Sequence, residues 1–222
     1  HRVDNFMDES LAGVLTIFSD RVRDVDIALD YMTSRWSEAK RIDAESIGAF
    51  GMSAGGFTVL TAAGARPDMR LIGPHCRTAP EFVCQVLQQL GSPLLVADTA
   101  WPGQPLQAAG RINAAVVAAP GLGFAFGPRG LAGVDVPVQL WSGEGDRRVP
   151  YETNAMLIQQ GLGSVDFHSI PLAGHASFLT PCRLLRPSAV CADPDGFDRE
   201  QFHRSMNQSV VEFFDRNLRP LR

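Results

Sequence analysis

The chain has 222 residues, of which 45% are hydrophobic and 20% charged, and its formal net charge is −4. This composition is that of a folded globular protein, and it excludes a disordered or fibrous chain. The sequence contains no basic run that could bind phosphates, so a nucleic-acid partner is not expected. The longest weakly polar stretch, residues 112–126, is too short to cross a bilayer, and no integral membrane segment is predicted.

The first third of the chain predicts a helix, a strand and a second helix. Apolar residues recur at helical spacing over residues 22–36, with arginine and aspartate between them. A short apolar run at residues 46–50 leads into a glycine-rich turn, and a second helix follows the turn as far as Gly64. This order is typical of a strand that passes through a tight turn into a helix.

Residues 65–110 are the least regular part of the chain. They hold two cysteines, several prolines and an apolar segment around residues 83–90. A stretch of this kind between two core strands predicts a lid or a substrate-binding insertion.

Strands and helices alternate over the rest of the chain. Apolar runs predict strands at residues 112–118, 136–141 and 165–170, and a helix is predicted over residues 150–160 with Gly161 as its stop. Strands that alternate with helices form a parallel sheet covered on both faces. We therefore expect a single α/β domain over the whole chain, residues 1–222.

A last helix is predicted to be capped by Asp198 and to bury Phe202, Met206, Val210 and Phe213.

The strongest chemical signal is the motif Gly51-x-Ser53-x-Gly55 between a predicted strand and a predicted helix. The turn is so tight that both flanking positions are expected to need glycine, and it raises the serine hydroxyl above the carboxyl edge of the sheet. The amide of Ala54 would then face an oxyanion that forms beside Ser53. The alternative is a glycine-rich turn in which Ser53 only caps the helix.

A serine hydroxyl needs a base and a carboxylate to become a nucleophile, and two later loops provide them. Asp146 follows the strand at residues 136–141, and His175 follows the strand at residues 165–170. The order serine, aspartate, histidine is that of the α/β-hydrolase arrangement. The alternatives are that Asp146 only caps the next helix, that Glu144 is the carboxylate, or that His175 is an ordinary loop histidine.

The other histidines are less well placed for catalysis. The chain starts at His1, His75 is expected in the loop beside Cys76, His168 lies within a predicted strand, and His203 lies on the polar side of the last helix.

The four cysteines fall into two close pairs, and each pair brackets a polar segment that contains proline. This spacing predicts two disulfides that close short loops and an oxidising compartment. It fits no zinc pattern, because there is no Cys-x-x-Cys and no nearby pair of histidines. Four unrelated buried thiols are the alternative. The predicted pairs are Cys76 with Cys84 and Cys182 with Cys191.

Several segments resemble the group of α/β-hydrolases called predicted dienelactone hydrolases, which is similar to platelet-activating-factor acetylhydrolases. The resemblance covers most of the chain, and it implies that Ser53, Asp146 and His175 are a catalytic triad that acts on carboxylic esters. True dienelactone hydrolases have a cysteine nucleophile where this chain has Ser53, so lactone hydrolysis is not expected. The paired cysteines look like those of exported members, which implies a periplasmic or secreted protein. The matching segments are residues 47–56, 143–150, 173–179 and 196–203.

Enzymes of this kind place several strands before the nucleophile strand, together with a His-Gly loop that supplies a second oxyanion donor. Residues 1–20 contain no His-Gly and no strand pattern. We therefore expect an α/β-hydrolase fold that lacks its N-terminal strands, with the second donor supplied from outside these residues.

The sequence thus predicts a serine hydrolase that cleaves a small-molecule ester through an acyl-enzyme and needs no metal or organic cofactor. A thioesterase or peptidase with the same triad is one alternative. A catalytically silent binding or structural chain is another, favoured if the N-terminal part is absent from the working protein. Oligomeric state has no signal in the sequence.

Overall fold

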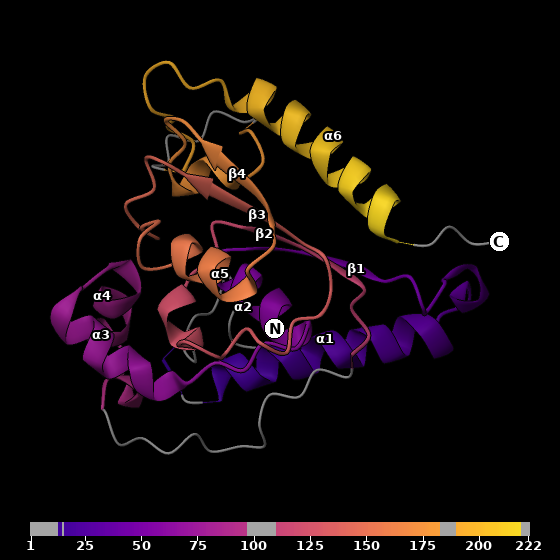
Figure 1. Cartoon of the computed structure of the whole chain (residues 1–222), viewed down its shortest axis with the longest axis horizontal. Helices are drawn as coiled ribbons and strands as arrows, with labels where there is room; N and C mark the ends of the chain where they lie inside the picture. Colours follow the sequence, from indigo (N-terminus) through magenta and orange to yellow (C-terminus); the bar gives the residue numbers. More distant parts are fainter. Residues whose placement is uncertain (1–12, 15, 97–109, 183–189, 219–222) are drawn as a thin grey trace.

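The computed structural model of the chain describes residues 13–14, 16–96, 110–182 and 190–218. These residues contain one sheet of four parallel strands in the order β1-β2-β3-β4, as Figure 1 shows. The first and last residues of each strand are at most two positions from the predicted ones. The strands are β1 (Gly48–Met52), β2 (Ala114–Ala118), β3 (Val138–Gly143) and β4 (Asp166–Ile170).

The register of the sheet brings the carboxyl ends of the strands to one edge. Met52 at the end of β1 pairs with Ala118 at the end of β2, which in turn pairs with Trp141 of β3. All residues of β2 and β3 are buried, as expected for the central strands of a parallel sheet. Loops that follow these strands therefore lie side by side.

Helices cover both faces of the sheet, and Figure 1 shows α6 on one side with α1, α2 and α5 on the other. Side chains alternate along β2, so that Ala115 and Val117 join the core beneath α1, α2 and α5, while Ala114 and Val116 join the core beneath α6. The α-helices are α1 (Ile17–Ser34), α2 (Ala54–Ala62), α3 (Ile72–Thr78), α4 (Phe82–Gln89), α5 (Ala155–Leu162) and α6 (Arg199–Asn217). The short 3₁₀ segments are η1 (Ala39–Arg41), η2 (Met69–Leu71), η3 (Pro93–Leu95), η4 (Gly123–Phe126) and η5 (His175–Phe178).

Two helices have boundaries that differ from the prediction. Helix α1 begins five residues earlier than expected, because Ile17 and Phe18 are buried and extend its apolar face. Helix α5 begins only at Ala155, and the predicted stop at Gly161 is wrong because that residue lies inside the helix. The helix ends instead at Leu162, and the capping residue Gly163 has a φ of 71°, a conformation that favours glycine.

The predicted irregular region, residues 65–110, contains two helices as far as the structure describes it, while residues 97–109 lie outside the described part. Helices α3 and α4 follow one another and form a short hairpin, which we call the α3–α4 hairpin. His75 lies within α3 and not in a loop as predicted. Pro74 is tolerated in α3 because it lies in the first turn, where the backbone N–H has no intrahelical partner.

Both predicted disulfides are present. Cys76 is joined to Cys84 within the α3–α4 hairpin, and Cys182 is joined to Cys191. The joined cysteines are 8 and 9 positions apart, respectively. In the chain-entropy model, closing a loop of this length stabilises the folded state by about 2.7 kcal/mol. None of the helices in the described residues is long and apolar enough to span a membrane.

Candidate active site

Ser53 occupies the turn between β1 and α2 in a conformation that is unusual for a residue other than glycine. Its φ is 54° and its ψ is −123°. Backbone hydrogen bonds hold it there: the Ser53 N–H donates to the Ala118 carbonyl at 2.9 Å, and its own carbonyl accepts from the N–H groups of Phe57 and Gly121. Such strain persists only where the surroundings fix it, and it is common at functional sites.

The two glycines of the motif have different roles. A Cβ atom at Gly51 would overlap the carbonyl of Gly55, so only glycine fits at position 51. A Cβ at Gly55 would have no atom within 4 Å. The expectation that both positions need glycine is therefore wrong for Gly55, which lies on an open side of α2.

Replacing Gly51 by alanine is expected to destabilise the fold by about 3 kcal/mol, because the added methyl collides with backbone that cannot move without breaking the turn. For a chain of this length, that loss lowers the melting temperature by about 6–12 °C. The matched control is Gly55→Ala, which is expected to leave the melting temperature unchanged or to raise it slightly, since alanine favours helix. Equal melting temperatures for the two variants would contradict the proposed role of Gly51.

His175 connects Ser53 to Asp146. The distance from His175 Nε2 to Ser53 Oγ is 3.0 Å, and the distance from His175 Nδ1 to Asp146 Oδ2 is 2.7 Å. An ionised carboxylate can only accept, so Nδ1 carries a proton and donates it, which leaves Nε2 free to accept from the serine hydroxyl. Ser53 makes no side-chain cap bond to α2, so the capping alternative is wrong. This arrangement can remove a proton from the hydroxyl.

Asp146 is held on both sides of its carboxylate. Its side chain is only 1% exposed, and while Oδ2 faces His175, Oδ1 accepts from the backbone N–H groups of Arg148 and Val149 at 2.9 Å each. It does not cap α5, which begins at Ala155. The competing carboxylate, Glu144, is exposed and accepts from Ser169 instead.

Further polar residues, to which the sequence assigns no role, support the loop that carries His175. The Ser177 hydroxyl accepts from the Gly174 N–H at 3.1 Å, and it lies 3.5 Å from Asp193 Oδ1. Asp193 pairs with the guanidinium of Arg199, whose side chain is 4% exposed. His203 donates from Nε2 to the Ser177 carbonyl. The contacts of Ser177 with Asp193 and His203 have no local sequence pattern, because they join η5 to α6 and to the segment that precedes it.

Removing the carboxylate of Asp193 is expected to destabilise the protein by about 3 kcal/mol, because Asp193→Ala leaves the buried charge of Arg199 without its partner. Thermal or urea unfolding measures this loss. The matched control is Asp195→Ala, since Asp195 is exposed two positions away. If the two variants unfold alike, the buried pair does not stabilise this region.

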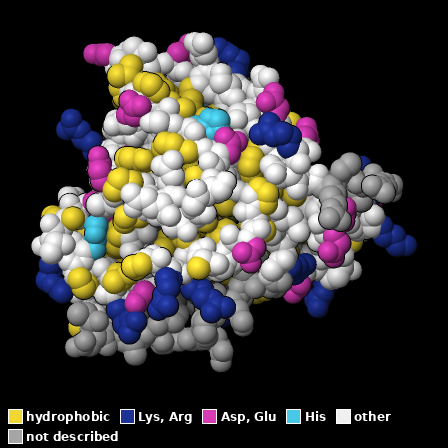
Figure 2. Space-filling model, in the orientation of Figure 1, with side chains coloured by type: hydrophobic (Ala, Val, Ile, Leu, Met, Phe, Trp, Pro, Cys, Tyr) yellow, Lys and Arg dark blue, Asp and Glu magenta, His cyan; other side chains and the backbone are white. Residues whose placement is uncertain are grey.

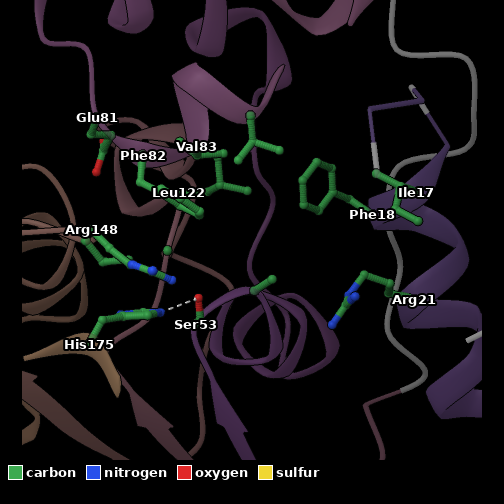
Figure 3. A pocket seen from close by; sticks show the side chains of 14 residues that line it. Ile17, Phe18, Arg21, Ser53, Glu81, Phe82, Val83, Leu122, Arg148 and His175 are labelled. Atoms are coloured by element: carbon green, nitrogen blue, oxygen red, sulfur yellow. Dashed lines mark hydrogen bonds between the residues drawn. The ribbon is translucent and has the colours of Figure 1, made fainter. Parts of the chain in front are cut away.

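A cavity of about 330 Å³ lies above Ser53 and His175 (Figure 3). Most of its wall is apolar, and it comes from α1 on one side and from the α3–α4 hairpin on the other. In Figure 3, Phe18 and Val83 lie across the cavity from His175, while the side chain of Arg148 extends over the histidine. The lining residues are Ile17, Phe18, Arg21, Ser53, Ala54, Glu81, Phe82, Val83, Val86, Gly121, Leu122, Arg148, Val149 and His175.

Ala54 is the first residue of α2 and lines the same cavity. The first N–H groups of a helix have no acceptor within the helix, so the amide of Ala54 is available to an oxygen bound beside Ser53. Helix N-termini also favour negative charge. The structure thus brings together a hydroxyl, a base, an acid and a backbone donor. Within the described ranges, no group of acidic, histidine or cysteine side chains could hold a metal ion.

Comparison with known proteins gives a likeness in structure alone. No family model matches the chain, and no curated protein is similar to it. Esterase 2 of Thermogutta terrifontis, in a form phosphoramylated by tabun, is 16% identical with a TM-score of 0.50, over 92% of this chain and 67% of that one. A putative dipeptidyl aminopeptidase IV of Bacteroides ovatus is 12% identical with a TM-score of 0.50, over 95% of this chain and 24% of that one. Together with the parallel sheet, these likenesses show an α/β-hydrolase fold.

Proposed function

We propose that this protein is a serine hydrolase that cleaves carboxylic esters, with Ser53, His175 and Asp146 as its catalytic triad. The observation that carries the proposal is the continuous path of hydrogen bonds from the buried carboxylate through the imidazole to the hydroxyl. The path ends at the floor of a largely apolar cavity, where the uncharged part of an ester can bind.

The reaction proceeds in two halves. In the first, Ser53 Oγ attacks the ester carbonyl while His175 Nε2 accepts the hydroxyl proton, and the N–H of Ala54 stabilises the oxyanion. The C–O bond to the alcohol then breaks, and the proton passes from His175 to the departing oxygen. In the second half, His175 accepts a proton from water as the water attacks the acyl carbonyl. The bond from the acyl carbon to Ser53 Oγ then breaks, His175 returns the proton to Ser53 Oγ, and the acid is released. Asp146 keeps the imidazole in the tautomer that both halves need.

We also assign the protein to the dienelactone-hydrolase-like group and propose a single domain over residues 1–222. Each of three matching segments carries one triad residue, and the fourth, residues 196–203, contains the cap of α6. The α3–α4 hairpin supports the assignment of residues 65–110 as a substrate-binding insertion, because four of its residues line the cavity. The expectation that strands are missing before the nucleophile strand concerns residues 1–20. Of these, residues 1–12 and 15 lie outside the described part.

The two disulfides support a protein that matures in an oxidising compartment, and we propose the periplasm or the cell exterior. Intact mass before and after reduction tests this assignment. Free thiols in protein purified from its native source would contradict it.

A fluorophosphonate probe tests the catalytic proposal, because it reacts with activated serines. We expect one equivalent of probe on Ser53 and faster turnover of a 4-nitrophenyl ester than of the matching thioester or anilide. A higher kcat/KM for the thioester or the anilide would instead identify a thioesterase or a peptidase. A folded sample that takes up no probe and hydrolyses none of these substrates would be a silent binding or structural chain.

A further inference from the structure

The α3–α4 hairpin forms one wall of the cavity, and Phe82, Val83 and Val86 are its apolar contacts. All three belong to α4, which begins directly after Glu81. Figure 2 shows that hydrophobic side chains are also exposed on the outer surface in this region. Phe82, for example, is 42% exposed. A hairpin that is open to solvent on one side needs specific contacts to keep its inner side in place.

Glu81 supplies these contacts through both of its carboxylate oxygens. Oε1 accepts from His75 Nε2 at 2.6 Å, which connects α4 to α3. Oε2 accepts from the side-chain amide of Asn154 at 2.9 Å, which connects the hairpin to the residue that precedes α5. The Glu81 side chain is 5% exposed. A buried carboxylate with two such partners would be costly to leave unpaired.

The partners of Glu81 are themselves fixed. The Asn154 side chain is fully buried and accepts from the Gly123 N–H at 2.9 Å. The ring of His75 stacks on Phe124, with 3.6 Å between the ring centroids. Glu81 and its partners therefore join the hairpin to η4 and to the residue that precedes α5.

Two further contacts act on the same hairpin. The disulfide between Cys76 and Cys84 joins α3 to α4 covalently. The guanidinium of Arg148 lies 4.7 Å from the centre of the Phe82 ring, and the backbone N–H of Arg148 donates to Asp146. The wall is thus also connected to the loop that carries the acid of the proposed triad.

We infer that Glu81 and the Cys76–Cys84 disulfide are positioning elements that hold α4 against the cavity and so determine the preference for esters with long acyl chains. This inference rests on the proposed ester hydrolysis. Glu81 takes no part in the chemistry, since both of its oxygens are engaged by His75 and Asn154. It acts through Phe82, Val83 and Val86, which contact the apolar part of the substrate.

The test compares kcat/KM for 4-nitrophenyl octanoate with that for 4-nitrophenyl acetate. Each buried methylene of a substrate contributes about fourfold to binding. In Glu81→Leu, which removes both hydrogen bonds, the octanoate-to-acetate ratio is expected to fall about tenfold or more, mainly through a higher KM for octanoate. In Glu81→Gln, the ratio is expected to stay within about threefold of the original. The glutamine can still accept from Asn154 and can donate to His75 in its other tautomer.

The disulfides provide a matched pair of variants. Cys76→Ser with Cys84→Ser is expected to lower the octanoate-to-acetate ratio, whereas Cys182→Ser with Cys191→Ser is expected to leave it unchanged. Both changes open loops of nearly the same length, so the loss of stability should be similar. Both esters are measured on the same sample of each variant, so a loss of active protein lowers both values equally and leaves the octanoate-to-acetate ratio unchanged.

An unchanged ratio in both Glu81→Leu and the Cys76/Cys84 variant, with ester turnover intact, would overturn this inference and leave the proposed function standing. Should Glu81→Leu fail to fold, the Cys76/Cys84 variant decides by itself. If the unaltered protein hydrolyses neither ester and takes up no fluorophosphonate, the proposed function fails, and the inference fails with it.

Discussion

Replacing Ser53 by alanine is expected to lower kcat for 4-nitrophenyl butyrate by about 10⁵-fold and to abolish labelling by a fluorophosphonate. Alanine removes the only atom of this residue that can attack the carbonyl, and His175 then has no hydroxyl to activate. The remaining rate comes from substrate binding and from the backbone donor at Ala54. Fold and stability should change little, because the Ser53 hydroxyl makes no cap bond to α2.

Stopped-flow and steady-state assays measure this loss, and near-ultraviolet circular dichroism checks the fold. The matched control is Ser169→Ala, which removes an exposed hydroxyl from β4, at the opposite side of the sheet from β1. Its kcat is expected to stay within about twofold, as is usual for a surface change. Should Ser53→Ala retain more than one hundredth of the original kcat, Ser53 is not the nucleophile.

Asp146→Asn is expected to lower kcat by about 10⁴-fold while the protein remains folded. The backbone N–H groups of Arg148 and Val149 both donate to Oδ1, so the amide oxygen of an asparagine must take that position. Its NH₂ group then faces His175 Nδ1, which has to become an acceptor. The ring proton moves to Nε2, and the imidazole can no longer accept the proton of Ser53.

The loss is expected in kcat and not in KM. The variant should still bind substrate, so KM is expected to change much less than kcat. The control is Glu144→Gln, which alters the nearby exposed carboxylate and is expected to leave kcat within about twofold. If Glu144→Gln is the more damaging change, then Glu144 and not Asp146 is the acid partner.

The strands and the positions of Ser53, Asp146 and His175 could be predicted because they depend on local patterns. Short apolar runs mark strands that are buried on both faces, and loops after parallel strands meet at one edge of the sheet. A motif between a strand and a helix then suffices to place Ser53. The two cysteine pairs were also predictable, because each closes a short loop.

The α3–α4 hairpin and its attachment could not be predicted, because they depend on contacts between distant parts of the chain. Glu81 and Asn154 are 73 positions apart, and neither has a neighbour that indicates the other. The side chain of Asn154 bonds to this network instead of capping α5, and that helix starts later than its apolar pattern suggests. Gly51 and Gly55 illustrate a different difficulty. The motif suggests that both positions need glycine, but only the packing shows that Gly51 does and Gly55 does not.

The pairing of the strands has a consequence for how activity is lost. Ser53, Asp146 and His175 follow three different strands, so the distances among them depend on the alignment of β1, β2, β3 and β4. A slip of one residue between neighbours moves a strand end by about 3.3 Å, which is longer than either hydrogen bond of His175. Partly assembled sheets should therefore be inactive, and an ester assay along a denaturation curve should report cooperative unfolding of the whole sheet.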